Sequence, residues 1–214
     1  MQRLGRVAYE PTFKQMLAFT QARSPATTDE IWLLEHPPVY TLGVRAHAGF
    51  VRPANDIPVV RTDRGGDVTY HGPGQPVVYP LLDIARRGLG IRSLVHTLEQ
   101  AVIETLAELG LLGERRDGAP GVYVEGRKIA SLGLRVRAGR TYHGLSFNAA
   151  MDLAPFAAID PCGYPGLEVT QLAELRPGID SADAGERLLG YVARLLGYTA
   201  APDDRLDLPT DKSS

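Results

Sequence analysis

The sequence predicts an α+β fold, and three patterns along the chain indicate it. Residues 91–109 carry apolar side chains at the spacing of a single helix face. Residues 121–148 contain three short extended runs separated by turn residues, which is typical of an antiparallel meander. Helical and extended segments do not alternate regularly, so a doubly wound parallel sheet is not expected.

The first half of the chain predicts one helix followed by short strands. Residues 11–23 form an amphipathic pattern with Phe13, Met16 and Leu17 on one face. Extended runs follow at residues 31–34, 39–42, 59–60, 68–70 and 76–82. The prolines in the last of these runs predict a strand with irregular pairing or at a sheet edge.

The second half begins with the clearest helix, residues 91–109, which ends at Gly110 because glycine suits a helix C-terminus. His96 near its apolar stripe is interpreted as a flanking side chain. Strands are expected at residues 121–125, 128–136 and 141–148, with turns at 126–127 and 138–140. A last helix is expected at residues 186–196.

Length and composition restrict the classes of protein to consider. The 214 residues suffice for one domain, assigned to residues 1–199, with a polar C-terminal tail at 200–214. A formal charge of −2 gives no case for a nucleic-acid or membrane partner. No apolar run is long enough to cross a bilayer. A single cysteine excludes an intrachain disulfide framework and is typical of the cytoplasm.

The run of residues 64–75 is the most informative segment. It has four glycines and a proline, so its backbone turns tightly and a ligand can approach closely. Residues 68–70 inside it predict a short strand. A loop, a strand and a second loop, flanked by Arg64 and His71, indicate a binding wall, and a glycine-rich hairpin without a ligand is the alternative.

The only cysteine, Cys162, follows a proline and precedes a glycine, so the chain should present it on a sharp turn. An inert structural thiol usually lies inside a strand or helix, which favours a nucleophile here. A catalytic thiol needs a partner group. One option is Cys–His–Asn, with His71 or His143 and with Asn148. The other is a Cys–Lys pair with Lys128.

Lys128 stands out because the chain uses arginine at nearly every basic position. Among 23 basic residues only Lys14, Lys128 and Lys212 are lysine, and the other two fall on the first helix and in the tail. Lysine can exchange a proton near neutral pH, whereas arginine cannot. An ammonium beside a thiol also lowers the pKa of that thiol. A plain surface lysine on a turn is the alternative.

Four segments, in order, resemble one family. Residues 64–75, 126–133 and 143–148, followed by 161–163, are similar to the lipoyl(octanoyl) transferases of lipoate biosynthesis, over roughly residues 30–175. The resemblance implies the fold of biotin protein ligase and lipoate–protein ligase, a mixed sheet flanked by helices. It implies that Cys162 is the acyl-thioester nucleophile and that Lys128 lowers the pKa of its thiol.

The resemblance also assigns an acyl pocket and partners. Its substrate-binding segments comprise Arg64, Gly65, Gly66, Asp67, Val68, Thr69, Tyr70, His71, Ser131, Leu132, Gly133, Gly144, Leu145 and Ser146, with His143 and Asn148 in support. The implied donor is octanoyl–acyl carrier protein. The implied acceptors are the lipoyl domains of 2-oxoacid dehydrogenase complexes and the glycine cleavage H protein. The implied enzyme is a cytoplasmic monomer.

The implied chemistry leaves some assignments open. Backbone N–H groups of nearby glycines are expected to stabilise the oxyanion. Either Lys128 or His143 would take the proton of the incoming amine. Four arginines near Lys128 in the sequence would steer acidic carrier proteins, unless they scatter over a solvated sheet face: Arg127, Arg135, Arg137 and Arg140.

Two other hypotheses remain open. An ATP-dependent lipoate or biotin ligase would bind a nucleotide and would not need Cys162. The sequence has no Walker loop, no dinucleotide fingerprint and no metal-ligand spacing, so no cofactor or metal is expected. A noncatalytic acyl-binding module would tolerate the loss of both Cys162 and Lys128, and their joint presence argues against it.

Overall fold

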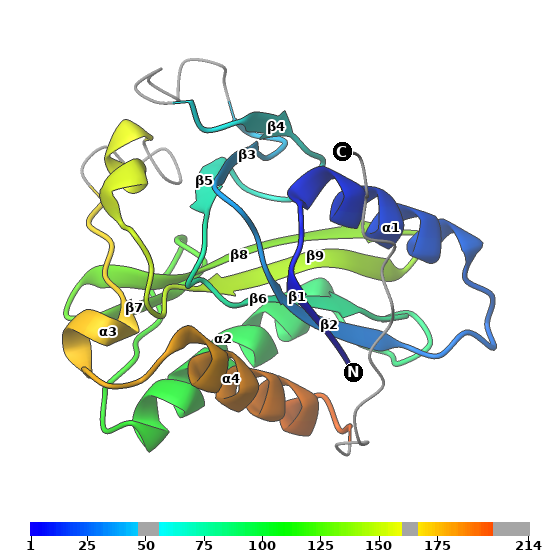
Figure 1. The fold of residues 1–214 in the computed structure, drawn as a ribbon. Helices are drawn as coiled ribbons and strands as arrows, with labels where there is room; N and C mark the ends of the chain where they lie inside the picture. The colour runs from blue at the N-terminus through cyan, green and yellow to red at the C-terminus, as the bar shows by residue number, and fades with distance from the viewer. Residues whose placement is uncertain (47–55, 160–166, 199–214) are drawn as a thin grey trace.

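The computed structural model describes residues 1–46, 56–159 and 167–198, which fold around a six-stranded sheet (Figure 1). Its strands, in spatial order, are β1 (Gln2–Arg6), β2 (Glu30–Glu35), β6 (Val77–Leu81), β9 (Arg140–Phe147), β8 (Arg127–Arg137) and β7 (Val122–Val124). The pair β1–β2 is parallel and the others are antiparallel, so the sheet is mixed. The α+β class and the meander of the last three strands are therefore confirmed.

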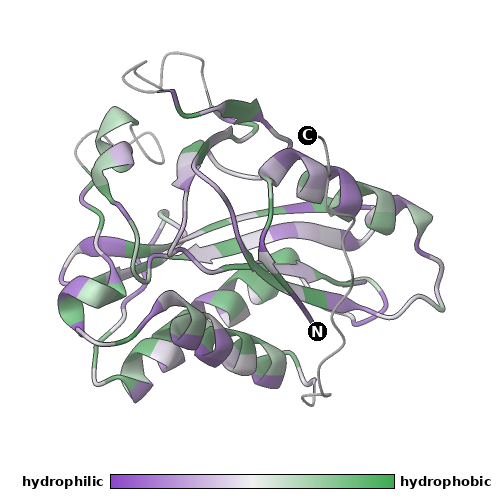
Figure 2. Ribbon diagram, in the orientation of Figure 1, coloured by the Kyte–Doolittle hydropathy of each residue, from purple (hydrophilic) through white to green (hydrophobic). Residues whose placement is uncertain are grey.

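Helices cover both faces of this sheet. The helices α2 (Ile91–Glu108) and α4 (Ser181–Leu195) pack together under one face, and α1 (Tyr9–Ala22) lies on the other (Figure 1). In Figure 2 hydrophobic and hydrophilic residues alternate around α2 and α4, as expected of helices with one buried side. Successive residues of β6 serve different layers: Val78 joins the core beside α2, whereas Val77 and Tyr79 pack on the α1 side.

A smaller sheet carries the glycine-rich run beside the main one. Its order is β4 (Val59–Arg61), β3 (Val39–Leu42) and β5 (Val68–His71). The 3₁₀ helix η2 (Ala154–Ala158) packs its Phe156 ring on Tyr70 of β5, at 5.5 Å between ring centroids. A short helix, α3 (Leu172–Leu175), follows. The backbone N–H of Gly65 donates to Leu134 O in β8 at 3.0 Å, which ties the two sheets together.

The prediction of an irregular or edge strand for residues 76–82 was partly wrong. The strand β6 is central, because β2 pairs with it along five residues. Pro80 disturbs only the pairing of β6 with its other neighbour, β9, which stops after Val78. There the Thr141 hydroxyl donates to Pro80 O at 2.6 Å. A side chain thus replaces a ladder hydrogen bond at the proline.

Helix starts were predicted less well than helix centres. The helix α1 begins two residues before the expected position, and α4 begins five residues early, at Ser181. The Asp180 side chain accepts from the backbone N–H of Asp183 at 2.8 Å and so caps α4. The turn before β8 is Glu125–Gly126, both with positive φ, one residue before its predicted place. The strand β1 and the two short helices were not predicted.

Candidate active site

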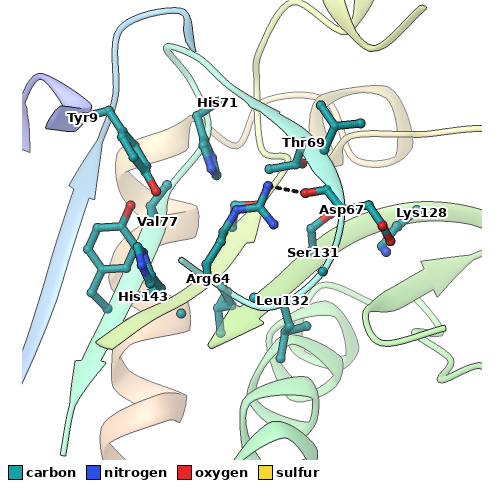
Figure 3. A pocket seen from close by; sticks show the side chains of 17 residues that line it. Tyr9, Arg64, Asp67, Thr69, His71, Val77, Lys128, Ser131, Leu132 and His143 are labelled. Atoms are coloured by element: carbon teal, nitrogen blue, oxygen red, sulfur yellow. Dashed lines mark hydrogen bonds between the residues drawn. The ribbon is translucent and has the colours of Figure 1, made fainter. Parts of the chain in front are cut away.

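A pocket lies between the glycine-rich run and the strands β8 and β9 (Figure 3). Fourteen of the residues singled out from sequence line it: Arg64, Gly66, Asp67, Val68, Thr69, His71, Lys128, Ser131, Leu132, Gly133, His143, Gly144, Leu145 and Ser146. Its free volume is about 50 Å³, so it is a narrow slot rather than an open basin. The close approach of the walls needs glycine, since a Cβ on Gly133 would lie 2.9 Å from Gly65 O.

Three lining residues were missed: Tyr9 in the first turn of α1, and Val77 and Tyr79 of β6. The alternation of β6 carried a usable signal, because Val77 and Tyr79 must share a face. Nothing in the sequence pointed to Tyr9. Its position depends on how α1 is laid across the sheet.

Three predicted site residues lie off the pocket wall. Gly65 contributes its backbone link to β8. Tyr70 belongs to the core of the small sheet. Asn148 lies behind the wall, where its Oδ1 accepts from Gln75 Nε2 at 2.9 Å. The Oε1 of Gln75 in turn accepts from His71 Nδ1 at 2.8 Å, so Asn148 and Gln75 together orient the His71 ring.

The buried Arg64 side chain holds the glycine-rich loop in shape. Its guanidinium donates to Thr41 O at 2.6 Å, Asp67 O at 2.8 Å and Gly65 O at 2.9 Å. Figure 3 shows this side chain in the middle of the pocket wall. The rigid fork of donors fixes several carbonyls at once, which a lysine could not do.

Lys128 is buried at one end of the pocket, so its interpretation as a plain surface lysine is wrong. Its Nζ donates to Pro120 O at 2.9 Å and lies 5.6 Å from the centroid of the Tyr123 ring. Gly121, with a φ of +139°, makes room for it, because a Cβ there would lie 2.6 Å from Lys128 Cε.

The backbone of Lys128 also pairs with the segment that follows Cys162 in the chain. Its N–H donates to Glu168 O at 2.8 Å, and its carbonyl accepts from the N–H of Thr170 at 2.9 Å. Cys162 itself lies outside the described residues.

The opposite end of the pocket is a cluster of neutral histidines and tyrosines. His36 Nδ1 donates to Val7 O at 2.7 Å, so its Nε2 accepts from the Tyr79 hydroxyl at 2.8 Å. Burial lowers the pKa of His36 to about 4. Burial, together with the neighbouring His36, lowers the pKa of His71 to about 3. Both rings are therefore uncharged at neutral pH.

His143 is the most constrained member of this cluster. Its φ of +58° lies in the left-handed region, which puts its ring on the same face of β9 as Tyr142, and it stacks on Phe13 with ring centroids 5.1 Å apart. Burial lowers the pKa of His143 although Asp63 opposes this effect. The neutral ring donates from Nε2 to Asp63 Oδ1 at 3.0 Å.

This tautomer leaves His143 Nδ1 as an acceptor, and that atom is buried without a hydrogen-bond partner. The Tyr9 hydroxyl also makes no hydrogen bond of normal geometry, although the nearby Thr62 side chain interacts with it and lowers its pKa. Burial raises the pKa of Tyr9 to about 12, so this hydroxyl keeps its proton. Each unpaired buried group costs about 1–3 kcal/mol.

The four arginines predicted to cluster near Lys128 do not form one group, although Arg137 and Arg140 are paired across the turn between β8 and β9. Arg127 and Arg137 lie at opposite ends of β8, roughly 33 Å apart at the usual strand rise. Arg127 pairs with Glu125, Arg135 approaches Asp63, and Arg140 approaches Asp83. Arg127 alone lies next to Lys128, and the other three lie toward the opposite end of β8.

The described residues hold no group of three or more histidine, cysteine or acidic side chains suited to a metal ion. Among the helices that the structure describes, none is long and apolar enough to cross a membrane.

Solved structures with the same architecture define the fold. A lipoate-protein ligase A bound with ATP matches with a TM-score of 0.76 at 16% identity, over 96% of this chain and 89% of the ligase. Biotin protein ligase from Aquifex aeolicus matches with a TM-score of 0.56 at 12% identity, over 92% of this chain and 69% of the ligase. The fold is therefore that of the biotin and lipoate protein ligases, as predicted.

Sequence relatives narrow this class. Residues 9–193 match the lipoyl protein ligase A/B catalytic domain, and the chain belongs to that family. An octanoyltransferase of Thiobacillus denitrificans is 63% identical over 82% of this chain and 80% of the relative. An octanoyltransferase of Azoarcus sp. is 57% identical over 94% of this chain and 89% of the relative. The protein is an acyltransferase within the fold class.

Proposed function

We propose that this enzyme transfers an octanoyl or lipoyl group from acyl carrier protein to a lysine of a lipoyl domain, through a thioester on Cys162. The observation that carries the proposal is the buried Lys128 ammonium, at one end of a narrow slot lined by the predicted acyl-binding segments. The names of the relatives support the transferred group. Residues 1–199 are the proposed catalytic domain.

The first step exchanges one thioester for another. The Cys162 thiolate attacks the carbonyl carbon of octanoyl–acyl carrier protein, a new C–S bond forms, and the old C–S bond breaks. The released carrier thiolate takes a proton, for which Lys128 is the proposed donor. The buried ammonium of Lys128, held by Pro120 O, would also favour the thiolate over the thiol.

The second step forms an amide. The ε-amine of the acceptor lysine attacks the acyl-enzyme, a C–N bond forms, the bond to Cys162 breaks, and the amine gives up a proton. Lys128 is a better proton acceptor than His143 on geometric grounds. His143 pairs with Leu134, six residues along β8 from Lys128, which is roughly 20 Å at the usual strand rise. His143 therefore belongs to the other end of the pocket.

The proposed partners follow from this chemistry. The donor is octanoyl–acyl carrier protein, and the acceptors are the lipoyl domains of 2-oxoacid dehydrogenase complexes and the glycine cleavage H protein. The proposal includes a cytoplasmic monomer without cofactor, metal, nucleic acid or membrane. Because both steps start from a thioester, neither needs ATP.

An ATP-dependent ligase is the second candidate, since a lipoate-protein ligase A bound with ATP shares the fold. One assay separates the two. Purified protein is mixed with octanoyl–acyl carrier protein and an unmodified lipoyl domain, with or without ATP. We expect octanoylation of the domain in both samples. Transfer only from free octanoate with ATP, and none from the carrier thioester, would support the ligase instead.

A further inference from the structure

The end of the pocket far from Lys128 has a chemistry that a plain alkyl chain does not require. Figure 3 shows Tyr9, His71 and His143 at this end, with Lys128 on the other side of the pocket. Val68, Val77 and Leu145 supply apolar walls between the two ends. A site built only for a methyl terminus would continue those walls to the end.

The pocket is long enough for a medium-chain acyl group. The ends are roughly 20 Å apart between the Cα atoms of Lys128 and the residue paired with His143. An extended chain of eight carbons spans roughly 8 Å, at about 3.5 Å for every three bonds. A chain whose carbonyl lies near Lys128 therefore extends toward the His143 end of the pocket.

Two polar atoms at this end are left without normal hydrogen bonds. His143 Nδ1 and the Tyr9 hydroxyl oxygen are buried, and their residues are 1% and 4% exposed. The orientation of the His143 ring is fixed from both sides, by its hydrogen bond to Asp63 and by stacking on Phe13. The ring thus holds an acceptor lone pair in a set direction, ready for a donor that the described residues do not supply.

We propose that Tyr9 and His143 form a subsite for a hydrogen-bond donor at the ω-carbon of the acyl chain, so that ω-hydroxylated medium-chain acyl thioesters are substrates. The hydroxyl donates to His143 Nδ1 and accepts from the Tyr9 hydroxyl, which pairs both atoms at once. This inference rests on the proposed acyl transfer. It adds a class of acyl group and two specificity-determining residues.

The sharpest test compares two donors of equal length that differ only at the last atom. Nonanoyl and 8-hydroxyoctanoyl groups, each loaded on acyl carrier protein, are given to the enzyme with a lipoyl domain, and kcat/KM is measured for both. The wild type should prefer the hydroxyl-bearing chain by roughly two- to tenfold, the range that one neutral hydrogen bond contributes. Equal rates, or a preference for nonanoyl, would overturn the proposal and would indicate a resident water at this end.

Variants locate the effect. In His143→Phe, which keeps a flat ring against Phe13, the preference should disappear, and in Tyr9→Phe it should fall severalfold. A preference that survives in His143→Phe would also overturn the proposal. If His143→Phe does not fold, Tyr9→Phe still tests the subsite, because this substitution removes only one oxygen atom. His96→Phe, on the exposed side of α2, is the control and should keep the wild-type ratio.

Transfer of the octanoyl group separates this inference from the function on which it rests. A wild type that transfers octanoyl groups but does not discriminate between the two test donors refutes the subsite alone. A wild type that transfers none of the three groups refutes the acyl transfer.

Discussion

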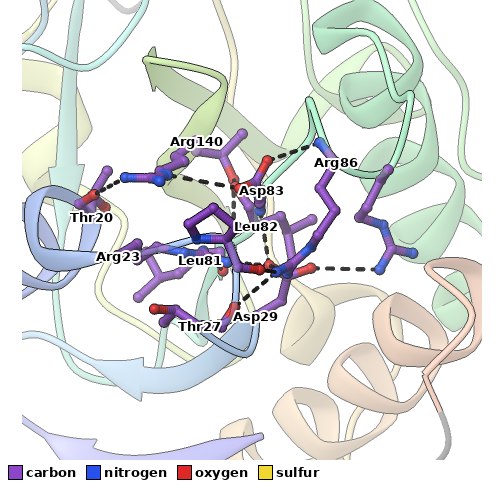
Figure 4. A network of polar contacts seen from close by, with 12 residues as sticks. Thr20, Arg23, Thr27, Asp29, Leu81, Leu82, Asp83, Arg86 and Arg140 are labelled. Carbon is purple, nitrogen blue, oxygen red and sulfur yellow. Dashed lines mark hydrogen bonds and ion pairs between the residues drawn. The ribbon is translucent and has the colours of Figure 1, made fainter.

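Two buried polar networks in this protein differ in one respect. Around Asp29, in Figure 4, both carboxylate oxygens have partners: Oδ1 accepts from Arg86 at 2.7 Å, from the Asp83 N–H at 2.9 Å and from Arg23, and Oδ2 accepts from Tyr198 at 2.7 Å and lies 3.7 Å from Arg87 Nη1. At the pocket end, in contrast, His143 Nδ1 and the Tyr9 hydroxyl have none of normal geometry.

The partners of Asp29 come from distant parts of the chain, so this carboxylate has a structural role. Arg23 follows α1, Asp83 follows β6 and Tyr198 follows α4, so one carboxylate joins three parts of the chain. Burial would raise the pKa of Asp29, but hydrogen bonds from Asp83, Tyr198 and Arg23 outweigh it and lower that pKa. A charge can be buried here because all its partners belong to the protein.

The pocket cluster is neutral instead, and it leaves acceptors open. Unpaired buried atoms are not confined to the pocket, since Arg23 Nε in the Asp29 network also lacks a partner. What distinguishes the pocket end is that its unpaired atoms belong to residues that line a cavity. Changes in the Asp29 network should therefore affect stability without affecting transfer, whereas changes at Tyr9 and His143 should affect which acyl group is transferred.

The largest effect is expected at Lys128. Lys128→Met keeps the length of the side chain but removes the charge and the exchangeable proton, so the transfer rate should fall by roughly 10²–10⁴-fold. Octanoyl transfer to a lipoyl domain measures this. Lys14→Met, on the exposed side of α1, is the matched control and should keep the wild-type rate. Full turnover in Lys128→Met would show that Lys128 takes no part in the transfer reaction.

A substitution in the other network should affect stability. Asp29→Ala leaves the Arg23 guanidinium, whose side chain is 1% exposed, without its carboxylate. The free energy of unfolding should fall by about 3–5 kcal/mol in urea titrations, while kcat/KM stays unchanged where the protein is folded. Asp183→Ala breaks an exposed pair with Arg187 and should cost less than about 1 kcal/mol. Similar losses of unfolding free energy in Asp29→Ala and Asp183→Ala would contradict a special stabilising role for Asp29.

Acid titration should separate the two networks by pH. The pKa of His36 is about 4 in the folded protein and about 6.5 when unfolded, so the unfolded chain binds more protons between these values. Stability is therefore fully present above pH 6.5 and is lost as pH falls towards 4, by about 3 kcal/mol for this ring. His71 adds to the same loss, down to about pH 3.

The lowered pKa of Asp29 gives a second loss in a more acidic range, because its contribution is present above the unfolded value, near 3.9, and disappears as pH falls through the folded one. Urea titrations between pH 8 and 4 check the first range. His36→Gln should flatten the slope there, whereas Asp29→Asn should leave it unchanged. An unchanged slope in His36→Gln would mean that its ring is not buried neutral.

Local patterns predicted much of this structure. The run 39–42 became β3 with the same bounds, because each of its four residues is buried and it is bounded by a proline and a glycine. The segments expected to bind the acyl group line one common pocket, since β8 and β9 are paired directly and the glycine-rich run docks on them.

What the sequence did not predict depends on long-range packing. Tyr9 reaches the pocket only because α1 crosses β9, and Asp29 meets Arg86 and Tyr198 across 57 and 169 residues of chain. Arg127 and Arg137 are only ten residues apart in sequence, yet they lie at opposite ends of the extended strand β8. The start of α4 did carry a local signal, the Asp180 cap, that was overlooked.

Intact-mass spectrometry of the protein with octanoyl–acyl carrier protein, in the absence of ATP, tests the central claim most directly. We predict one octanoyl group on the wild type, located on Cys162 by peptide mapping, released by hydroxylamine and absent from Cys162→Ala. A wild type that stays unmodified, or an adduct that persists in Cys162→Ala, would contradict the account.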